Sequence, residues 1–175
     1  MLKKAIFWDR DGVLGALVPL RSDGEKNVSP QKAEDFNIIP EAIAAVKGAK
    51  EKGYLNIVIT NQPDIARGKM SEAELQKMHD LLQKEIPTID AIYVCLHDDP
   101  DNCDCRKPKP GLILEAGKDF GIDYQQSYVV GDSIKDIEAG KQAGCKTIFL
   151  TKDSTLIDCN FMINDLKEID QIIKN

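Results

Sequence analysis

Two aspartates, Asp9 and Asp11, directly follow an apolar run that residues 5–8 form. That run is predicted to be a short buried strand, so both carboxylates lie at its carboxyl end, where open α/β sheets place their ligand sites. Two aspartates this close repel each other, and a cation would keep at least one of them ionised and usable as a nucleophile. Magnesium, which prefers oxygen ligands, fits that role. Taken alone, the motif is equally compatible with a strand that ends in an Asx turn.

A dense cationic segment, Arg106-Lys107-Pro108-Lys109-Pro110-Gly111, lies immediately before a predicted helix. Lysines fixed between prolines at a helix N-terminus are well suited to neutralise a phosphoryl group or a nucleophilic aspartate, although a solvated basic loop is the alternative. Arg10 and Arg67 also fall at predicted strand ends. We therefore expect a locally basic pocket, suited to a small anionic substrate, on a protein of net charge −6.

Polar groups follow two further predicted strands. Thr60 and Asn61 offer a hydroxyl and an amide that could bind phosphate oxygens, although a plain turn is the alternative. Asp132 and Asp136 follow the run Val129-Val130-Gly131 and are four residues apart, so both can lie on one side of the first turn of a helix. Asp132 is then a natural metal ligand together with Asp9, unless it only caps the helix.

Four soft ligands lie within eleven residues: Cys95, His97, Cys103 and Cys105. Three thiolates and one imidazole form a closed tetrahedral zinc set without an open position, which predicts a structural zinc. Such an ion would fix the loop of residues 97–106 and aim Arg106 and Lys107 into the site. Ordinary loop cysteines are the alternative. The remaining Cys145 and Cys159 have no partner at metal spacing and are expected to be small core residues.

The elements that must position these groups alternate along the chain. Strands are expected at 5–8, 55–59, 91–96, 128–130, 147–150 and 161–163, and helices at 40–53, 72–85, 112–120 and 134–143, with a closing helix at the end. Ser71 and Glu74 predict a capping box before the second helix, and His79 on that helix is expected to be a surface or edge residue. This pattern predicts an α/β fold with a parallel sheet and helices on both faces, in a single domain of residues 1–175.

Residues 15–36 lack any clear period and form a long loop beside the aspartates, which we call the flap. It is the longest insertion, so no separate cap domain is expected. The acidic net charge disfavours binding to nucleic acid or to an anionic membrane surface. The first apolar run is too short for a signal peptide and nothing later could span a bilayer, so a cytoplasmic protein is expected.

In this order, Asp9-x-Asp11, Thr60, Lys107 and Gly131-Asp132-x-x-x-Asp136 resemble the motifs of the haloacid dehalogenase (HAD) superfamily of phosphohydrolases. The resemblance implies a Rossmann-like, HAD-like sheet. It also implies that Asp9 attacks phosphorus to form an aspartyl phosphate, while Asp11 is the general acid and base. Magnesium would then bind the Asp9 and Asp132 side chains and the Asp11 carbonyl, with Asp136 supporting this metal shell. Thr60 and Lys107 would hold the phosphoryl oxygens.

The cysteine-rich loop, Thr60-Asn61-Gln62 and Ala66-Arg67-Gly68 resemble the branch that contains heptose bisphosphate phosphatases and histidinol phosphatases. This resemblance implies substrate contacts from Asn61 and Arg106, and charge suggests that Arg67 meets a second phosphate. Gly15, Pro63-Asp64 and Ser133 depart from the pattern of the branch. The expected function is a magnesium-dependent, monomeric phosphomonoesterase acting on a small sugar bisphosphate. Histidinol phosphate is the alternative substrate, and a non-catalytic, zinc-stabilised module that senses phosphorylated metabolites is the alternative function.

Overall fold

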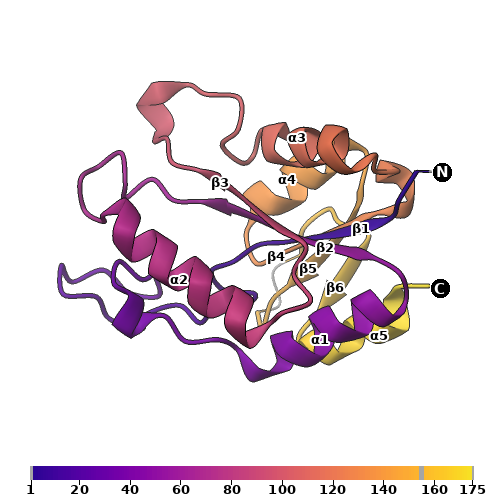
Figure 1. Ribbon diagram of the computed structural model, residues 1–175, viewed down its shortest axis with the longest axis horizontal. Coiled ribbons are helices and arrows are strands. Elements are labelled where there is room, and N and C mark those ends of the chain that lie inside the picture. Colours follow the sequence, from indigo (N-terminus) through magenta and orange to yellow (C-terminus); the bar gives the residue numbers. More distant parts are fainter. Residues whose placement is uncertain (1, 154–155, 175) are drawn as a thin grey trace.

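The computed structural model describes residues 2–153 and 156–174 and contains one six-stranded parallel sheet with the strand order β3-β2-β1-β4-β5-β6 (Figure 1). The expected α/β fold is confirmed. The strands are β1 (Ala5–Trp8), β2 (Leu55–Asn61), β3 (Ala91–Cys95), β4 (Tyr128–Gly131), β5 (Lys146–Leu150) and β6 (Phe161–Ile163). Thr60 and Asn61, expected just after the second strand, are its last two residues because they continue the pairing with β3.

Helices cover both faces of the sheet, as expected (Figure 1). One face packs against α1 (Pro40–Glu51), α2 (Glu72–Glu85) and the one-turn helix α5 (Ile169–Ile172), which follows the 3-10 helix η4 (Leu166–Glu168). The other packs against α3 (Gly111–Phe120) and α4 (Ile134–Ala143). Alternation along β1 divides these two cores, since Ile6 and Trp8 enter the first and Phe7 enters the second.

The strand order places the carboxyl ends of β1 and β4 at a topological switch point. The chain runs outward from β1 through β2 to β3 and then returns to β4 on the other side of β1. Loops that follow β1 and β4 therefore diverge, which leaves a crevice at this edge of the sheet. The expected site residues Asp9, Asp11 and Asp132 all belong to these loops.

The flap is ordered rather than structureless. An antiparallel bridge joins Val18 to Val28, the 3-10 helix η1 (Ala33–Asp35) follows, and the buried Phe36 anchors its end in the first core. The Glu74 carboxylate accepts a hydrogen bond of 2.8 Å from the Ala33 amide. The expected capping box is therefore only half formed: Ser71 accepts from the Glu74 amide, while the Glu74 side chain fixes the flap instead of closing the box.

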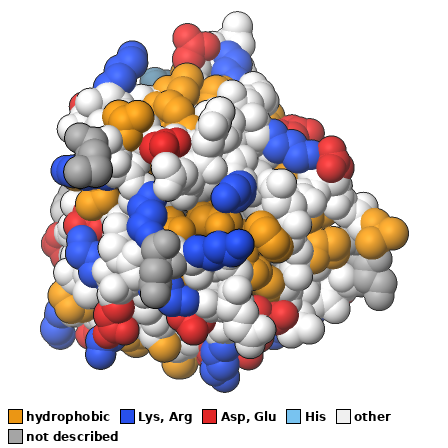
Figure 2. Space-filling view, turned by 90° about the vertical axis from the view of Figure 1, so that its right-hand side faces the viewer, with side chains coloured by type: hydrophobic (Ala, Val, Ile, Leu, Met, Phe, Trp, Pro, Cys, Tyr) orange, Lys and Arg blue, Asp and Glu red, His pale blue; other side chains and the backbone are white. Residues whose placement is uncertain are grey.

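The opposite, amino edge of the sheet carries the two ends of the described chain and an aromatic cluster. Lys4 and Lys146 lie over the rings of Tyr54 and Tyr128, at 4.3 and 5.2 Å from the ring centroids. On this side of the molecule, hydrophobic side chains are visible among cationic and acidic ones of mixed sign (Figure 2). No helix of the described residues is both long and apolar enough to cross a membrane.

Candidate active site

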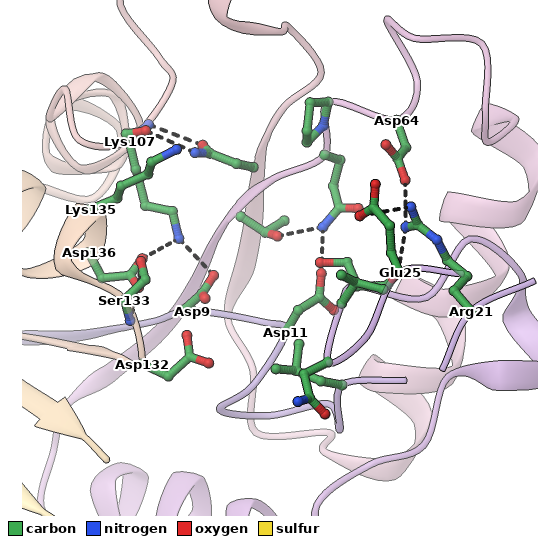
Figure 3. A pocket seen from close by; sticks show the side chains of 18 of the residues that line it. Asp9, Asp11, Arg21, Glu25, Asp64, Lys107, Asp132, Ser133, Lys135 and Asp136 are labelled. Atoms are coloured by element: carbon green, nitrogen blue, oxygen red, sulfur yellow. Dashed lines mark hydrogen bonds and ion pairs between the residues drawn. The ribbon is translucent and has the colours of Figure 1, made fainter. Parts of the chain in front are cut away.

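A cavity of about 350 Å³ opens at the switch point (Figure 3). Its floor carries the carboxylates that follow β1 and β4, its walls carry polar residues that end β2, and the flap lies over one side. The sequence-predicted residues that line it are Asp9, Asp11, Thr60, Asn61, Arg67, Lys107, Asp132 and Asp136. Asp9 and Asp136, which are 127 residues apart in the chain, thus line the same cavity. Its volume is typical of small-molecule sites.

Lys107 lies at the bottom of the cavity between two carboxylates. Its Nζ donates to Asp9 Oδ1 at 2.7 Å and to the Ile59 carbonyl at 3.0 Å, and it forms an ion pair of 2.6 Å with Asp136 Oδ1. Burial alone would lower the pKa of this ammonium, but the charges of Asp136 and Asp9 outweigh burial and raise the pKa. Lys107 is therefore a permanent buried cation that two carboxylates and one backbone carbonyl hold in place.

Asn61 fixes the backbone of this lysine. The Asn61 amide donates to the Lys107 carbonyl at 3.0 Å and accepts from the Lys107 amide at 3.1 Å. Both polar atoms of the side chain are therefore engaged by the protein itself. This clasp positions Lys107, and because the second amide proton of Asn61 is not used by it, the predicted substrate contact of Asn61 stays a prediction.

Asp136 holds Lys107 from the other side. Asp136 Oδ2 accepts from the Ser133 amide at 3.1 Å and from the Ser133 hydroxyl at 2.8 Å, which closes a capping box at the start of α4. Its other oxygen faces Lys107. The helix is thus capped by Ser133 and Asp136, which leaves the Asp132 carboxylate to face the cavity (Figure 3).

Asp9, Asp132 and Asp136 each place a carboxylate oxygen within 4.8 Å of the others. Burial, followed by repulsion from Asp136, raises the pKa of Asp9 well above its ordinary value and that of Asp132 to about 6. A hard divalent cation would stabilise the ionised form of these carboxylates, because it prefers oxygen ligands and offsets their mutual repulsion. Asp9, Asp132 and Asp136 are the carboxylates that could hold magnesium, and the Asp11 carbonyl as a further ligand stays a prediction.

Gly12 permits this close grouping. Its φ of +90° favours glycine, and a Cβ atom built there would lie 1.9 Å from Asp132 Oδ2. The loop after β1 therefore passes against the Asp132 carboxylate at a distance that only glycine allows. The sequence motif places a glycine at this point, although the reason for it is visible only in three dimensions.

Asp11 lies beside Asp9 but faces a different partner. Arg10 Nε and Nη2 donate to its two oxygens, both at 2.8 Å, and Gln62 Nε2 donates at 2.9 Å. Burial would raise the pKa of Asp11, but the charge and hydrogen bonds of Arg10 outweigh it and lower that pKa. The roles that the resemblance implies require an ionised Asp9 as nucleophile and a protonated Asp11 as acid when the leaving group departs. The protein alone favours the reverse order, because Arg10 lowers the pKa of Asp11, whereas burial and the nearby Asp136 and Asp132 raise that of Asp9 in spite of Lys107.

Arg10 and His79 form a buried layer behind Asp11. Arg10 is fully buried, lies 5.2 Å from the Phe36 ring centroid and approaches His79 Nε2 to 3.4 Å. The expectation that His79 is a surface or edge residue is wrong, since only 8% of it is exposed. Burial and the nearby Arg10 lower the pKa of His79 to about 4, so a neutral imidazole supports the arginine.

Gln62 is a site residue for which the sequence offered only a weak signal. Its Nε2 donates to Thr60 Oγ1 at 2.8 Å as well as to Asp11. Residues 60 and 62 share one side of an extended segment because side chains alternate with a period of two. Since Gln62 occupies an acceptor position of Thr60, the hydroxyl proton of Thr60 is free to point into the cavity.

The expectation of a basic pocket is wrong. The cavity is lined by four cations and six carboxylates, namely Arg21, Arg67, Lys107 and Lys135 against Asp9, Asp11, Glu25, Asp64, Asp132 and Asp136. Of the other cations that suggested a basic pocket, Arg10 is buried against Asp11, and Lys109 turns to the backbone of Asn102 and Cys103. The prediction was wrong because the cations at the strand ends pair with carboxylates from other segments of the chain.

The two arginines expected to bind substrate are paired with acids. Arg67 lines the cavity but makes two hydrogen bonds of 2.7 Å to Asp98. Arg106 donates to Asp99 at 2.6 Å and lines a neighbouring cavity on the far side of the loop. Both guanidinium groups thus stabilise the loop of residues 97–106, which contains the 3-10 helix η2 (Asp99–Asp101).

The four soft ligands form a compact cluster below this loop. The three sulfur atoms of Cys95, Cys103 and Cys105 lie 2.9 to 3.6 Å apart, and His97 Nδ1 lies 3.7 Å from Cys95 and 3.3 Å from Cys105. Sulfurs bound to one tetrahedral zinc at about 2.3 Å would be roughly 3.8 Å apart. The cluster therefore fits one zinc ion after a small expansion. Cys145 is buried as expected, whereas Cys159 is only partly buried.

Comparisons with known proteins agree with this geometry. A family model described as HAD-hydrolase-like matches residues 104–159. D-glycero-β-D-manno-heptose-1,7-bisphosphate 7-phosphatase of Haemophilus ducreyi is 36% identical over 90% of this chain and 87% of its own length. The D-glycero-α-D-manno-heptose-1,7-bisphosphate 7-phosphatase of Photorhabdus laumondii is 38% identical over 85% of this chain and 82% of its own.

This chain belongs to the heptose bisphosphate phosphatase family of HAD-like hydrolases. The crystal structure of the D,D-heptose 1,7-bisphosphate phosphatase from B. bronchiseptica, complexed with magnesium and phosphate, superimposes on it with a TM-score of 0.83. The two chains are 25% identical, and the match covers 97% of each. The expected family is therefore confirmed, and the cavity described above lies in a fold that holds magnesium and phosphate in that relative.

Proposed function

We propose that this protein is a magnesium-dependent phosphomonoesterase that removes the 7-phosphate of D-glycero-D-manno-heptose 1,7-bisphosphate. The observation that carries the proposal is the contact of 2.7 Å between Asp9 and the buried Lys107, beside Asp132, in the floor of the cavity. A binding module would have no need for a nucleophilic carboxylate next to an acid and base. Family membership supports the substrate class.

Asp9 is the nucleophile in this proposal. One of its carboxylate oxygens forms a bond to phosphorus while the bond from phosphorus to the sugar oxygen breaks, which yields an aspartyl phosphate. The Lys107 ammonium and the Thr60 hydroxyl bind the phosphoryl oxygens, and Lys107 exchanges Asp9 for a phosphoryl oxygen as its acceptor. Magnesium, when held by Asp9 and Asp132, supplies the positive charge that keeps Asp9 ionised and offsets the charge of the phosphoryl group.

Asp11 moves the protons in both half-reactions. It gives a proton to the departing sugar oxygen, and it later takes one from the water whose oxygen attacks phosphorus and releases Asp9 and inorganic phosphate. The low pKa of Asp11 suits the second step, in which it is the base. The first step needs a protonated Asp11, which an incoming phosphoryl dianion favours because nearby negative charge raises a carboxyl pKa. Gln62 and Arg10 keep this carboxyl aimed during both steps.

We further propose that Cys95, His97, Cys103 and Cys105 hold a structural zinc. The sulfur and nitrogen distances support one tetrahedral ion, and four protein ligands leave no position for a substrate. The ion would anchor the loop that leads into Lys107. A cytoplasmic location and a monomeric state stay predictions, which cell fractionation and light scattering would test.

The test is phosphate release from both anomers of the heptose bisphosphate and from histidinol phosphate, each with magnesium or with a chelator. Both anomers are needed because relatives with either specificity resemble the chain. We expect magnesium-dependent turnover of one heptose anomer above the other substrates, and none with Asp9→Asn. Turnover of histidinol phosphate alone would show that histidinol phosphate, and not the heptose bisphosphate, is the substrate. No turnover of any phosphoester would refute the proposed function.

A further inference from the structure

The rim of the cavity under the flap, which we call the flap rim, carries two arginines that are already paired with carboxylates. Arg21 pairs with Asp23 at 2.7 Å, with Asp64 at 3.1 Å and with Glu25 at 3.5 Å. Arg67 pairs with Asp98 at 2.7 Å and with Asp64 at 3.4 Å. Each arginine is therefore paired with at least two carboxylates, of which Asp23 also pairs with Lys69 and Asp98 with Arg106.

This flap rim offers little to a second phosphate group. Each guanidinium would have to leave a carboxylate before it could bind a phosphate, and the carboxylate left behind would repel the same group. Arg21 is also buried, with its side chain 8% exposed. The flap rim is therefore a poor site for a phosphate that is not cleaved.

Lys135 lies on the opposite side of the cavity, in the first turn of α4. Its side chain is exposed and lines the cavity near Lys107 (Figure 3). Among the described residues, it is the cavity-lining cation that has no carboxylate oxygen within 4.0 Å and no hydrogen bond. Its ammonium is thus available to an anion without the loss of an existing ion pair.

Two acidic side chains near Lys135 already have partners of their own. On its own helix, Asp136 forms an ion pair with Lys107 and accepts from the Ser133 hydroxyl. On the loop of residues 97–106, Asp99 accepts from Arg106 Nε at 2.6 Å, so Arg106 already satisfies that carboxylate.

We propose that Lys135 binds the second, uncleaved phosphate of the substrate and so determines the preference for a bisphosphate over a monophosphate. The inference rests on the proposed function and deepens it. It assigns to Lys135 the role that charge in the sequence suggested for Arg67. The uncleaved phosphate would lie between the start of α4 and the loop of residues 97–106, on the side of the cavity remote from the flap.

The test compares heptose 1,7-bisphosphate with heptose 7-phosphate, which retains the cleaved group and lacks the second one. A charge-assisted contact of this kind predicts that Lys135→Met raises KM for the bisphosphate by about ten- to a hundredfold, with little change in kcat. KM for the 7-phosphate should hardly change. Lys135→Arg, which keeps the charge, should recover most of the preference.

Two variants make the result specific. Lys141→Met removes a cation from the last turn of the same helix, away from the cavity, and should leave both KM values as they are. Arg67→Met tests the competing residue. Equal losses on both substrates with Lys135→Met, or a lost preference with Arg67→Met alone, would overturn the role of Lys135. If the unaltered protein cleaves neither compound, the proposed function fails and this inference fails with it.

Discussion

Replacement of Gly12 by alanine should damage the metal site far more than the fold. The added methyl group would lie 1.9 Å from Asp132 Oδ2 and 2.5 Å from its Cγ, so the Asp132 carboxylate must turn away from Asp9. Asp132 is only partly buried, which gives its side chain room to rotate into the cavity. We expect the magnesium concentration for half-maximal activity to rise by about ten- to a hundredfold, as for other displaced groups at metal sites.

The cost in stability follows from the backbone alone. A non-glycine residue at a positive φ costs about 1–2 kcal/mol, and φ is +90° at Gly12. The free energy of unfolding, measured with urea in the presence of a chelator, should therefore fall by about 1–2 kcal/mol. The clash adds little to this loss because rotation of the Asp132 side chain relieves it. The Gly12→Ala variant should therefore stay folded during the magnesium titration.

Gly121→Ala is the matched control. Gly121 follows α3 at the amino edge of the sheet, has a φ of +66°, and a Cβ there would meet no atom within 4 Å. It should lose a similar amount of stability and keep the magnesium dependence of the unaltered protein. Equal magnesium dependence of Gly12→Ala and Gly121→Ala would refute the reasoning, since the backbone penalty would then be the whole effect.

Three further perturbations test other parts of the structure. Lys107→Met leaves two buried carboxylates without their cation and should abolish activity and lower the free energy of unfolding by about 3–5 kcal/mol; an unchanged urea midpoint would contradict this. His79 has a pKa of about 4 in the folded protein against 6.5 in the unfolded chain, so the unfolded chain alone gains a proton as the pH falls from 6.5 to 4. The free energy of unfolding should lose about 3 kcal/mol over that window, and His79→Gln should lack this component, whereas parallel curves would exclude it. Cys105→Ser should lose bound zinc, measured by atomic emission, and expose the loop of residues 97–106 to protease, while Cys159→Ser should retain both properties.

The arrangement of strands and helices was predictable because it depends on patterns within short windows. The buried run of β1 and the apolar stripe of α2 appear in the sequence with their observed bounds. The convergence of Asp9, Thr60 and Asp132 followed in turn, because parallel strands bring their carboxyl ends to one edge. The contact between Lys107 and Asp9 is the geometric result of that rule.

Pairings between loops were not predictable in this way. Arg67 and Asp98 are 31 residues apart, and nothing in either segment shows that the flap, the turn after β2 and the loop of residues 97–106 meet. The same holds for Arg10, whose charge pointed to a substrate pocket but which stacks on Phe36 and holds Asp11. A cation in a sequence signals an anion nearby, and only the fold shows whether that anion is a ligand or a carboxylate of the protein.

The most direct test of the account is to trap the proposed aspartyl phosphate. The protein is mixed with magnesium and heptose bisphosphate, quenched in acid within a turnover and treated with borohydride, which reduces an acyl phosphate of aspartate to homoserine. Peptide mass spectrometry should find homoserine at position 9 only, and none in a sample without substrate. Phosphate release without modification at Asp9, or with modification at another aspartate, would contradict the assignment of Asp9 as the nucleophile.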